Sequence, residues 1–555
     1  MEPTRKTECT PEVVRKIQSI EDRSDKCYQE LALLELPWNM AVWAALTDSI
    51  VVIEKSVPPH LYGSRHHINA VTNASFVAAQ FYKLARQHGR KQTLNWNSLG
   101  WTPRLAAQCK HDFEIAMGYN TFCTVFPHWH ADKYAVVLVY DNVARFVSQA
   151  SPLGRRINAY QQGIRPTTLK NESEQGMQTG PTLQRLLARS LGSAKRISRH
   201  GVVFLELRDL WEALYAAHEM RTRTMGRRYP ELRIGDYDLE DFRKCYSAIN
   251  AIAAAHEFLC YRWSQENGLP FDSLLLFEHR FDWVRNLSRL ASLSREQVYA
   301  MLKDLTFGRV HAVNFHLLPF VPLKEDRSLL ALAPYCSLSS NWEENILGCL
   351  SRLDPARYSR SSVTKEEEMR RPLVARTSGI RLISGGYKLP SPLPDIDLLV
   401  EDIAANILII GELKWVRKPS GQKDRESRDK EVLKGFSQIE KIRTFLMMNP
   451  SYLPERCCIS QDLSRYKSVH YCVVARDHLV EPPEGAVPLY SYDSFLAEFT
   501  NSENTAASLN ALERLEWLPV EGVDFSVQFD RHNAGGVAVE SETYYPAGRR
   551  LVLAR

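Results

Sequence analysis

The sequence lacks any long apolar segment. Across its 555 residues, no uncharged apolar run approaches the ~20 residues that a membrane-spanning helix needs. The first ten residues, Met1 to Thr10, are polar and charged and contain no apolar stretch of the kind found in secretory signals. These absences predict a soluble, cytoplasmic protein with no membrane partner.

An excess of charge of one sign and metal-type cysteine pairs are also missing. Lys and Arg number 70 against 65 Asp and Glu, so the formal net charge of +5 does not by itself indicate a polyanionic partner. The 11 cysteines are scattered, and the only close pair, Cys457 and Cys458, is adjacent rather than at zinc-knuckle spacing. We therefore expect reduced thiols, and we expect any nucleic-acid surface to be local.

The bulk composition is that of a globular protein with several domains. With 44% hydrophobic and 24% charged residues the chain can bury a sizeable core, but 555 residues exceed what one core usually organises. Apolar periodicity predicts a multi-domain α/β protein. Its expected parts are a mostly helical region with some strands over 1–150, a polar linker or surface excursion over 151–200, a helical middle domain over 201–355, an α/β domain over 356–500 and an extension over 501–555.

Two neighbouring strands are predicted in the segment that follows Pro394. Apolar residues mark Ile396 to Val400 and Ile407 to Trp415, and the short segment between them fits a turn that joins two adjacent strands. The two strands are therefore expected to pair with each other.

Three ionisable side chains are expected to meet on this strand pair. Side chains alternate between the faces of a strand, so Glu412 and Lys414 share one face while Leu413 points to the other. Pairing of the strands would bring the carboxylate of Asp397 toward them. Such charges at the end of an apolar run are costly unless a partner charge compensates them.

The chemistry that suits these residues is metal-dependent hydrolysis of a phosphodiester. Carboxylate oxygens are ligands that Mg²⁺ prefers, and one or two often suffice because water fills the other positions. Asp397 and Glu412 supply that minimum, for Mg²⁺ or for Mn²⁺ as a substitute. Lys414 would orient or deprotonate the attacking water and stabilise the charge that develops on the phosphate.

Pro394 with Asp395 or Asp397, followed by Glu412-Leu413-Lys414, resembles the PD-(D/E)xK nuclease superfamily. The resemblance covers roughly 361–500 and implies a restriction-endonuclease-like α/β/α domain with a mixed central sheet. It also implies a nuclease whose nucleic-acid partner is DNA, by the family's general habit. The region before residue 350 is then expected to recognise a substrate or partner.

The same resemblance implies roles for residues on the flanking helices. A glutamate on a helix before the first core strand would be a third metal ligand, which is either Glu367 or Glu368, with Glu368 preferred. A Gln or a basic residue on the helix after the E-x-K strand would lie near the scissile phosphate, so Gln438 is assigned a catalytic role and Lys434 is a further candidate. Asp397 is preferred to Asp395 because apolar residues follow it within the strand.

A non-catalytic nucleic-acid-binding or scaffold protein that retains the nuclease fold is the alternative. Short D…ExK motifs occur by chance, and an isolated Glu-Leu-Lys at a strand end is more often a surface ion pair. Eight basic residues between Lys414 and Lys434 either contact a nucleic-acid backbone or form a solvated loop, because four acidic residues alternate with them. The sequence leaves a protein partner or an oligomer open.

Overall fold

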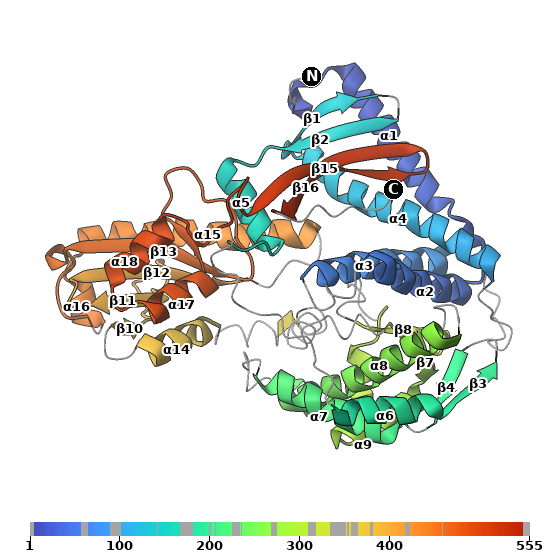
Figure 1. The fold of residues 1–555 in the computed structure, drawn as a ribbon. Helices are drawn as coiled ribbons and strands as arrows, with labels where there is room; N and C mark the ends of the chain where they lie inside the picture. Colours follow the sequence, from blue (N-terminus) through green and yellow to red (C-terminus); the bar gives the residue numbers. More distant parts are fainter. Residues whose placement is uncertain are drawn as a thin grey trace. The chain divides into compact units, whose positions relative to one another are not determined.

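The chain folds into two compact units, each built from several segments of the sequence. Unit 1 comprises residues 1–148, 174–358 and 530–541, and unit 2 comprises residues 149–173, 359–529 and 542–555. The computed structural model describes residues 5–56, 65–88, 102–140, 142–166, 181–198, 201–205, 207–224, 233–234, 236–267, 275–308, 318–333, 351, 355–356, 365–377, 381–416, 422–457 and 459–547. Most of the helices and strands of both units are labelled in Figure 1.

The predicted multi-domain mixture of helices and strands is confirmed. The division of the chain differs from the five consecutive parts expected from the sequence. The boundary expected near 356 falls close to Ser359, whereas the expected linker over 151–200 and extension over 501–555 are each shared between the two units. Among the described helices, none combines the length and the apolar character needed to cross a bilayer.

Unit 1 is rich in helices. Its α-helices are α1 (Pro11–Gln29), α2 (Trp38–Ser56), α3 (Arg65–His88), α4 (Pro103–His130), α6 (Pro181–Gly192), α7 (Arg208–Thr224), α8 (Leu239–Asn267), α9 (Arg280–Ala291) and α10 (Arg295–Asp304). Apolar side chains from α2, α3, α4, α7 and α8 share one core. Helix α10 begins with a capping box: the amide of Gln297 donates to Oγ of Ser294 at 3.1 Å, and Oε1 of Gln297 accepts from the amide of Ser294 at 3.0 Å.

The strands of unit 1 form small sheets. The largest has the order β1-β2-β16-β15, in which β1 (Tyr134–Val139) pairs with β2 (Val143–Ser148) and β2 pairs in parallel with β16 (Val537–Pro546). β15 (Phe525–Ala534) completes this sheet; residues 530–541 of β15 and β16 belong to unit 1, and the rest of these two strands belongs to unit 2. The remaining strands are β3 (Ala194–Ser198) with β4 (Gly201–Phe204), β5 (Arg233–Ile234) with β6 (Tyr237–Asp238), and β7 (Leu276–His279), β9 (Leu329–Leu332) and β8 (Phe320–Pro322) in that order.

Unit 2 is built on a five-stranded mixed sheet of order β10-β11-β12-β13-β14. The strands are β10 (Leu382–Ser384), β11 (Leu398–Asp402), β12 (Ile407–Trp415), β13 (Ser468–Arg476) and β14 (Leu489–Ser491). β10, β11 and β12 are antiparallel, whereas β12, β13 and β14 are parallel. The predicted strands over 396–400 and 407–415 are thus present as β11 and β12.

Helices cover both faces of this sheet. α15 (Gln422–Met448) lies on the face of Glu412 and Lys414, because its Gly435 approaches Lys414 and Val473 closely. α17 (Tyr492–Asn501) lies on the other face, where the Tyr492 ring contacts Arg476. α14 (Lys365–Thr377) packs beside α17, and α5 (Pro152–Gln161), α16 (Tyr452–Arg456) and α18 (Thr505–Glu513) complete the unit.

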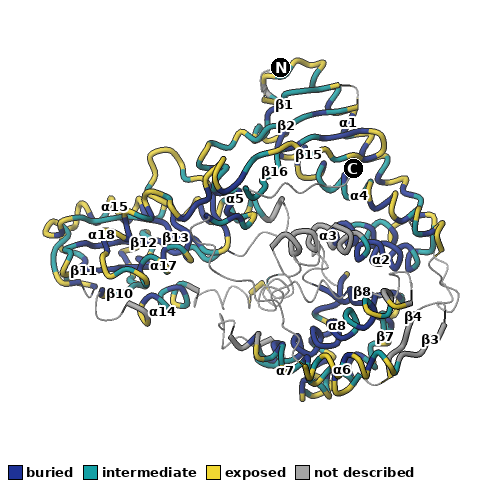
Figure 2. Tube along the Cα trace, viewed as in Figure 1, coloured by how far each residue is buried: buried dark blue, intermediate teal, exposed yellow. Residues whose placement is uncertain are grey.

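Because both faces are covered, the central strands are mostly apolar and largely buried. β11 and the first seven residues of β12 are buried, and the central strands are dark blue in Figure 2. The charged side chains of these strands are therefore held in a largely dry interior.

Candidate active site

Asp397 and Glu412 lie opposite each other on neighbouring strands. β11 pairs with β12 so that Leu398 is the partner of Gly411, and continuing this register by one residue sets Asp397 across from Glu412. Oδ2 of Asp397 accepts a hydrogen bond from the amide of Leu413 at 3.0 Å. Asp397 is 6% exposed and Glu412 is 1% exposed. The two carboxyl groups therefore share one buried space, as the sequence predicts.

Lys414 completes a cluster of three charges. Its Nζ donates a hydrogen bond to Oε1 of Glu412, and its side chain is 17% exposed against 2% for that of Glu412. The stem of Lys414 passes over Gly435 of α15, where a Cβ would lie 3.2 Å from Cε of the lysine. The absence of a side chain at position 435 lets the helix approach the sheet at this point.

The electrostatics of the cluster favour the binding of a cation. Burial, followed by the nearby charge of Glu412, raises the pKa of Asp397 to about 7. Burial also raises the pKa of Glu412, against the opposing effect of the Lys414 ammonium. Oε2 of Glu412 is buried and has no hydrogen-bond partner among the described residues. An acceptor in this state is costly, and a bound cation would remove the cost.

These groups fit a Mg²⁺ site with few protein ligands. Two buried carboxylates with one orphaned oxygen match an ion that takes one or two protein ligands and keeps several waters. Within the described part of the chain, no preformed cluster of three or more His, Cys, Asp or Glu side chains meets the requirements of a metal site. Asp397 and Glu412 therefore form a pair rather than a complete protein cage.

The helix glutamate whose charge acts on this pair is Glu366, not the preferred Glu368. Asp397 contributes to raising the pKa of Glu366, and Glu366 in turn contributes to raising that of Glu412. Glu368 instead pairs with Arg371 at 2.9 Å, and the charge of Arg476 acts on it. In a helix, positions 366 and 368 point in widely different directions, so only one of them can face Asp397.

Arg370 ties α14 to the start of β11. It lies one turn after Glu366, and its Nη1 donates to the backbone carbonyl of Asp397 at 2.6 Å. Gly385 makes this contact possible, because a Cβ there would lie 2.0 Å from the same carbonyl oxygen and 2.9 Å from Cδ of Arg370. The helix, the turn and the strand thus meet at the backbone of the Asp397 ligand candidate.

The two candidates on α15 lie on the helix that covers the site but are not bonded to it. Gln438 follows Gly435 by about one turn and is half-buried, with a buried Oε1 that has no partner among the described residues. Lys434 is exposed. In the described part of unit 2, no hydrogen bond or ion pair joins either residue to Asp397, Glu412 or Lys414.

No family model, curated protein or solved structure matches the chain. The geometry of this cluster is therefore the basis on which a function can be assigned.

The exposed Asp395 takes no part in the strand pairing, so the structure favours Asp397 over Asp395. Glu366 and Arg370 are the residues that sequence reasoning missed. Their signal was present in the four-residue spacing from Glu366 to Arg370 and in the apolar Met369 and Leu373 that fix the inward face of α14.

Proposed function

We propose that unit 2 is a metal-dependent phosphodiesterase, specifically a nuclease with a PD-(D/E)xK type of site. The observation that carries the proposal is the meeting of Asp397, Glu412 and Lys414 on one buried face of two neighbouring strands. A surface ion pair does not require a second carboxylate buried against it, nor an orphaned carboxylate oxygen.

Asp397 and Glu412 would hold Mg²⁺, or Mn²⁺ in its place, and Glu366 is a further carboxylate whose charge acts on this pair. A divalent ion there would supply positive charge that polarises a phosphodiester and makes a bound water more acidic. The amide of Leu413 fixes the orientation of the Asp397 carboxylate. Lys414, the most exposed of the three groups, is placed to orient the attacking water and to stabilise negative charge on the phosphate.

The surroundings of the cluster support the same assignment. A mixed sheet with helices on both faces, and a site on its central strands, is the arrangement that a restriction-endonuclease-like fold would have. The substrate that we propose is DNA, and the role that we propose for unit 1 is recognition of a substrate or partner.

Cleavage by the full-length protein tests the proposal. Single-stranded, duplex and supercoiled DNA and an RNA would be incubated with Mg²⁺, Mn²⁺ or EDTA. Lys414→Ala and Asp397→Ala are expected to lower the rate by about 10²- to 10³-fold, because each removes a group that acts in the transition state. Asp395→Ala is the matched control, since it removes an exposed aspartate two residues away.

Metal-dependent cleavage that survives both substitutions would contradict the assignment of the site. Intact nucleic-acid binding with no cleavage under any metal would instead favour the scaffold alternative.

A further inference from the structure

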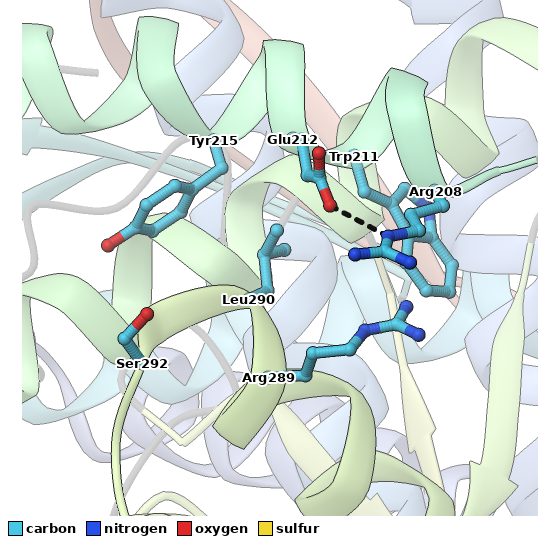
Figure 3. Close-up of a pocket in the computed structure, with 7 residues that line it drawn as sticks. All are labelled: Arg208, Trp211, Glu212, Tyr215, Arg289, Leu290 and Ser292. Atoms are coloured by element: carbon cyan, nitrogen blue, oxygen red, sulfur yellow. Dashed lines mark hydrogen bonds and ion pairs between the residues drawn. The ribbon is translucent and has the colours of Figure 1, made fainter.

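Unit 1 contains a pocket between α7 and α9 with an unusual pairing of arginines and aromatic rings (Figure 3). Its volume is about 220 Å³, and its lining includes two arginines, two aromatic residues and one glutamate. None of these residues takes part in the site on unit 2.

The charge at one end of the pocket is positive. In Figure 3 the guanidinium groups of Arg208 and Arg289 point toward the same end. Glu212 neutralises the first, because its Oε1 lies 2.9 Å from Nε of Arg208. Arg289 makes no ion pair or hydrogen bond with a described residue and leaves one guanidinium uncompensated. A planar guanidinium is well suited to a phosphate group.

The aromatic residues give the pocket a second kind of contact. Trp211 and Tyr215 are four residues apart on α7 and so lie on the same side of the helix. Both rings are half-buried and pack against the core of unit 1, as does Leu290 between the two ends of the pocket. Rings fixed in this way lose little freedom when a planar base stacks on them.

The size of the pocket separates two kinds of ligand. Sites that enclose a small molecule usually measure about 300 to 1,000 Å³, so about 220 Å³ suits only part of a ligand. The side chains of Arg208 and Glu212 are 69% and 55% exposed, so the rest of the ligand has an open path along the surface. A long chain that inserts one of its units fits better than an enclosed metabolite.

We propose that this pocket binds one nucleotide of a single-stranded nucleic acid, with its phosphate between Arg208 and Arg289 and its base against the aromatic rings. The site is separate from the phosphodiesterase site and does not depend on cleavage. A free nucleotide has the same chemistry, and the strand is favoured by the volume.

Binding is measured by fluorescence anisotropy with the full-length protein in EDTA and a labelled oligothymidylate of about twelve nucleotides. Arg289→Ala is expected to weaken binding about tenfold, since it removes a charge-assisted contact. Arg285→Ala is the matched control: this arginine lies on the same helix but is paired with Asp282 at 2.8 Å outside the pocket. The unlabelled strand, AMP and a duplex of the same length serve as competitors.

A second variant separates specific binding from a structural effect. Glu212→Gln removes the carboxylate that competes with the phosphate, so it is expected to tighten binding about two- to fivefold. The matched control is Asp209→Asn, which removes an acid of the same helix that pairs with Arg189. A gain in affinity in the first variant alone would support the site.

The competitors identify the source of the nucleotide. Competition by the strand alone supports the proposal as stated, and AMP competition that is lost in Arg289→Ala supports the same pocket with a free nucleotide as its ligand. Equal losses in Arg289→Ala and Arg285→Ala would show general charge attraction and overturn the proposal, as would the absence of any binding.

Discussion

Gly435 of α15 lies directly against the side chain of Lys414. A Cβ at position 435 would lie 3.2 Å from Cε and 3.3 Å from Cγ of the lysine, and 3.2 Å from Cγ1 of Val473. The conformation of the one basic side chain of the cluster is therefore set by a helix that begins only after the strand has ended.

Gly435→Ala is expected to lower nuclease activity more than stability. The methyl group must displace the Lys414 stem, whereas the gain in helix propensity of about 1 kcal/mol offsets part of the strain. We expect the cleavage rate to fall about tenfold or more while the melting temperature changes by a few degrees. Single-turnover cleavage and calorimetry would measure the two effects, with Ser437→Ala on the exposed side of α15 as the control. Full activity in Gly435→Ala would show that the position of Lys414 is not critical.

The buried carboxyl pair predicts that the metal-free protein loses stability as the pH rises from about 4 to about 7. The pKa of Asp397 and that of Glu412 are both raised on folding, so their stabilising contribution is present below the unfolded pKa near 4. It is lost as the pH rises through the folded pKa, which is about 7 for Asp397.

Asp397→Asn removes this penalty while keeping an oxygen that can accept from the Leu413 amide. In EDTA at pH 8, the variant is expected to be more stable than the wild type by about 2 to 4 kcal/mol, with no advantage at pH 4. Urea denaturation of both proteins at the two pH values gives the comparison. An equal difference at pH 4 and pH 8 would contradict the ionisation argument.

Divalent cations are expected to stabilise the wild type most where the carboxyls are ionised. Mg²⁺ at about ten times its dissociation constant should add about 1.4 kcal/mol at pH 8, and less at pH 5.5 because protons compete for the same oxygens. The measurement is the melting temperature against Mg²⁺ concentration, with EDTA reversal. Asp397→Asn should show much less stabilisation, and an unchanged response in that variant would place the ion elsewhere.

The two helix glutamates give a matched pair of variants. Glu366→Gln is expected to raise the Mg²⁺ concentration needed for half-maximal cleavage, about three- to tenfold, because Glu366 is electrostatically linked to Asp397 and Glu412. Glu368→Gln is expected to leave that concentration unchanged, since it loses only the pair with Arg371. The opposite ranking of the two variants would restore Glu368 as the metal-side residue.

The strand part of the site was predictable because its geometry is local. In β11 and β12, side-chain alternation and a short turn determine which residues face each other. The proximity of Asp397, Glu412 and Lys414 can therefore be inferred from the sequence. The helix glutamate that faces the site was not predictable, because Glu366, Glu367 and Glu368 are consecutive. Only the packing of Met369 against unit 2 decides which of them faces inward.

Long-range packing also explains what the sequence could not show in the fold. The polar segment after residue 150 contains α5, whose Arg156 donates to the carbonyls of Leu515, Leu518 and Pro519. Such contacts leave no local periodicity, so the segment has the composition of a linker. The pairing of β2 with β16 is equally invisible, since neither strand indicates its partner.

The sheet of unit 1 limits when the protein can finish folding during synthesis and where the chain can be cut into fragments that fold. Arg145 of β2 and Glu540 of β16 are 395 positions apart, yet their side chains meet at 2.6 Å. During synthesis, the sheet that β1 and β2 begin can therefore be completed only after almost all of unit 2 has been made. A fragment that ends at residue 358 would lack β15 and β16, and the remaining piece would lack α5 and would carry β16 with the edge that pairs with β2 exposed. Separate expression of the two halves would thus yield two incomplete proteins, and co-expression of complementary fragments is the form of dissection that the topology permits.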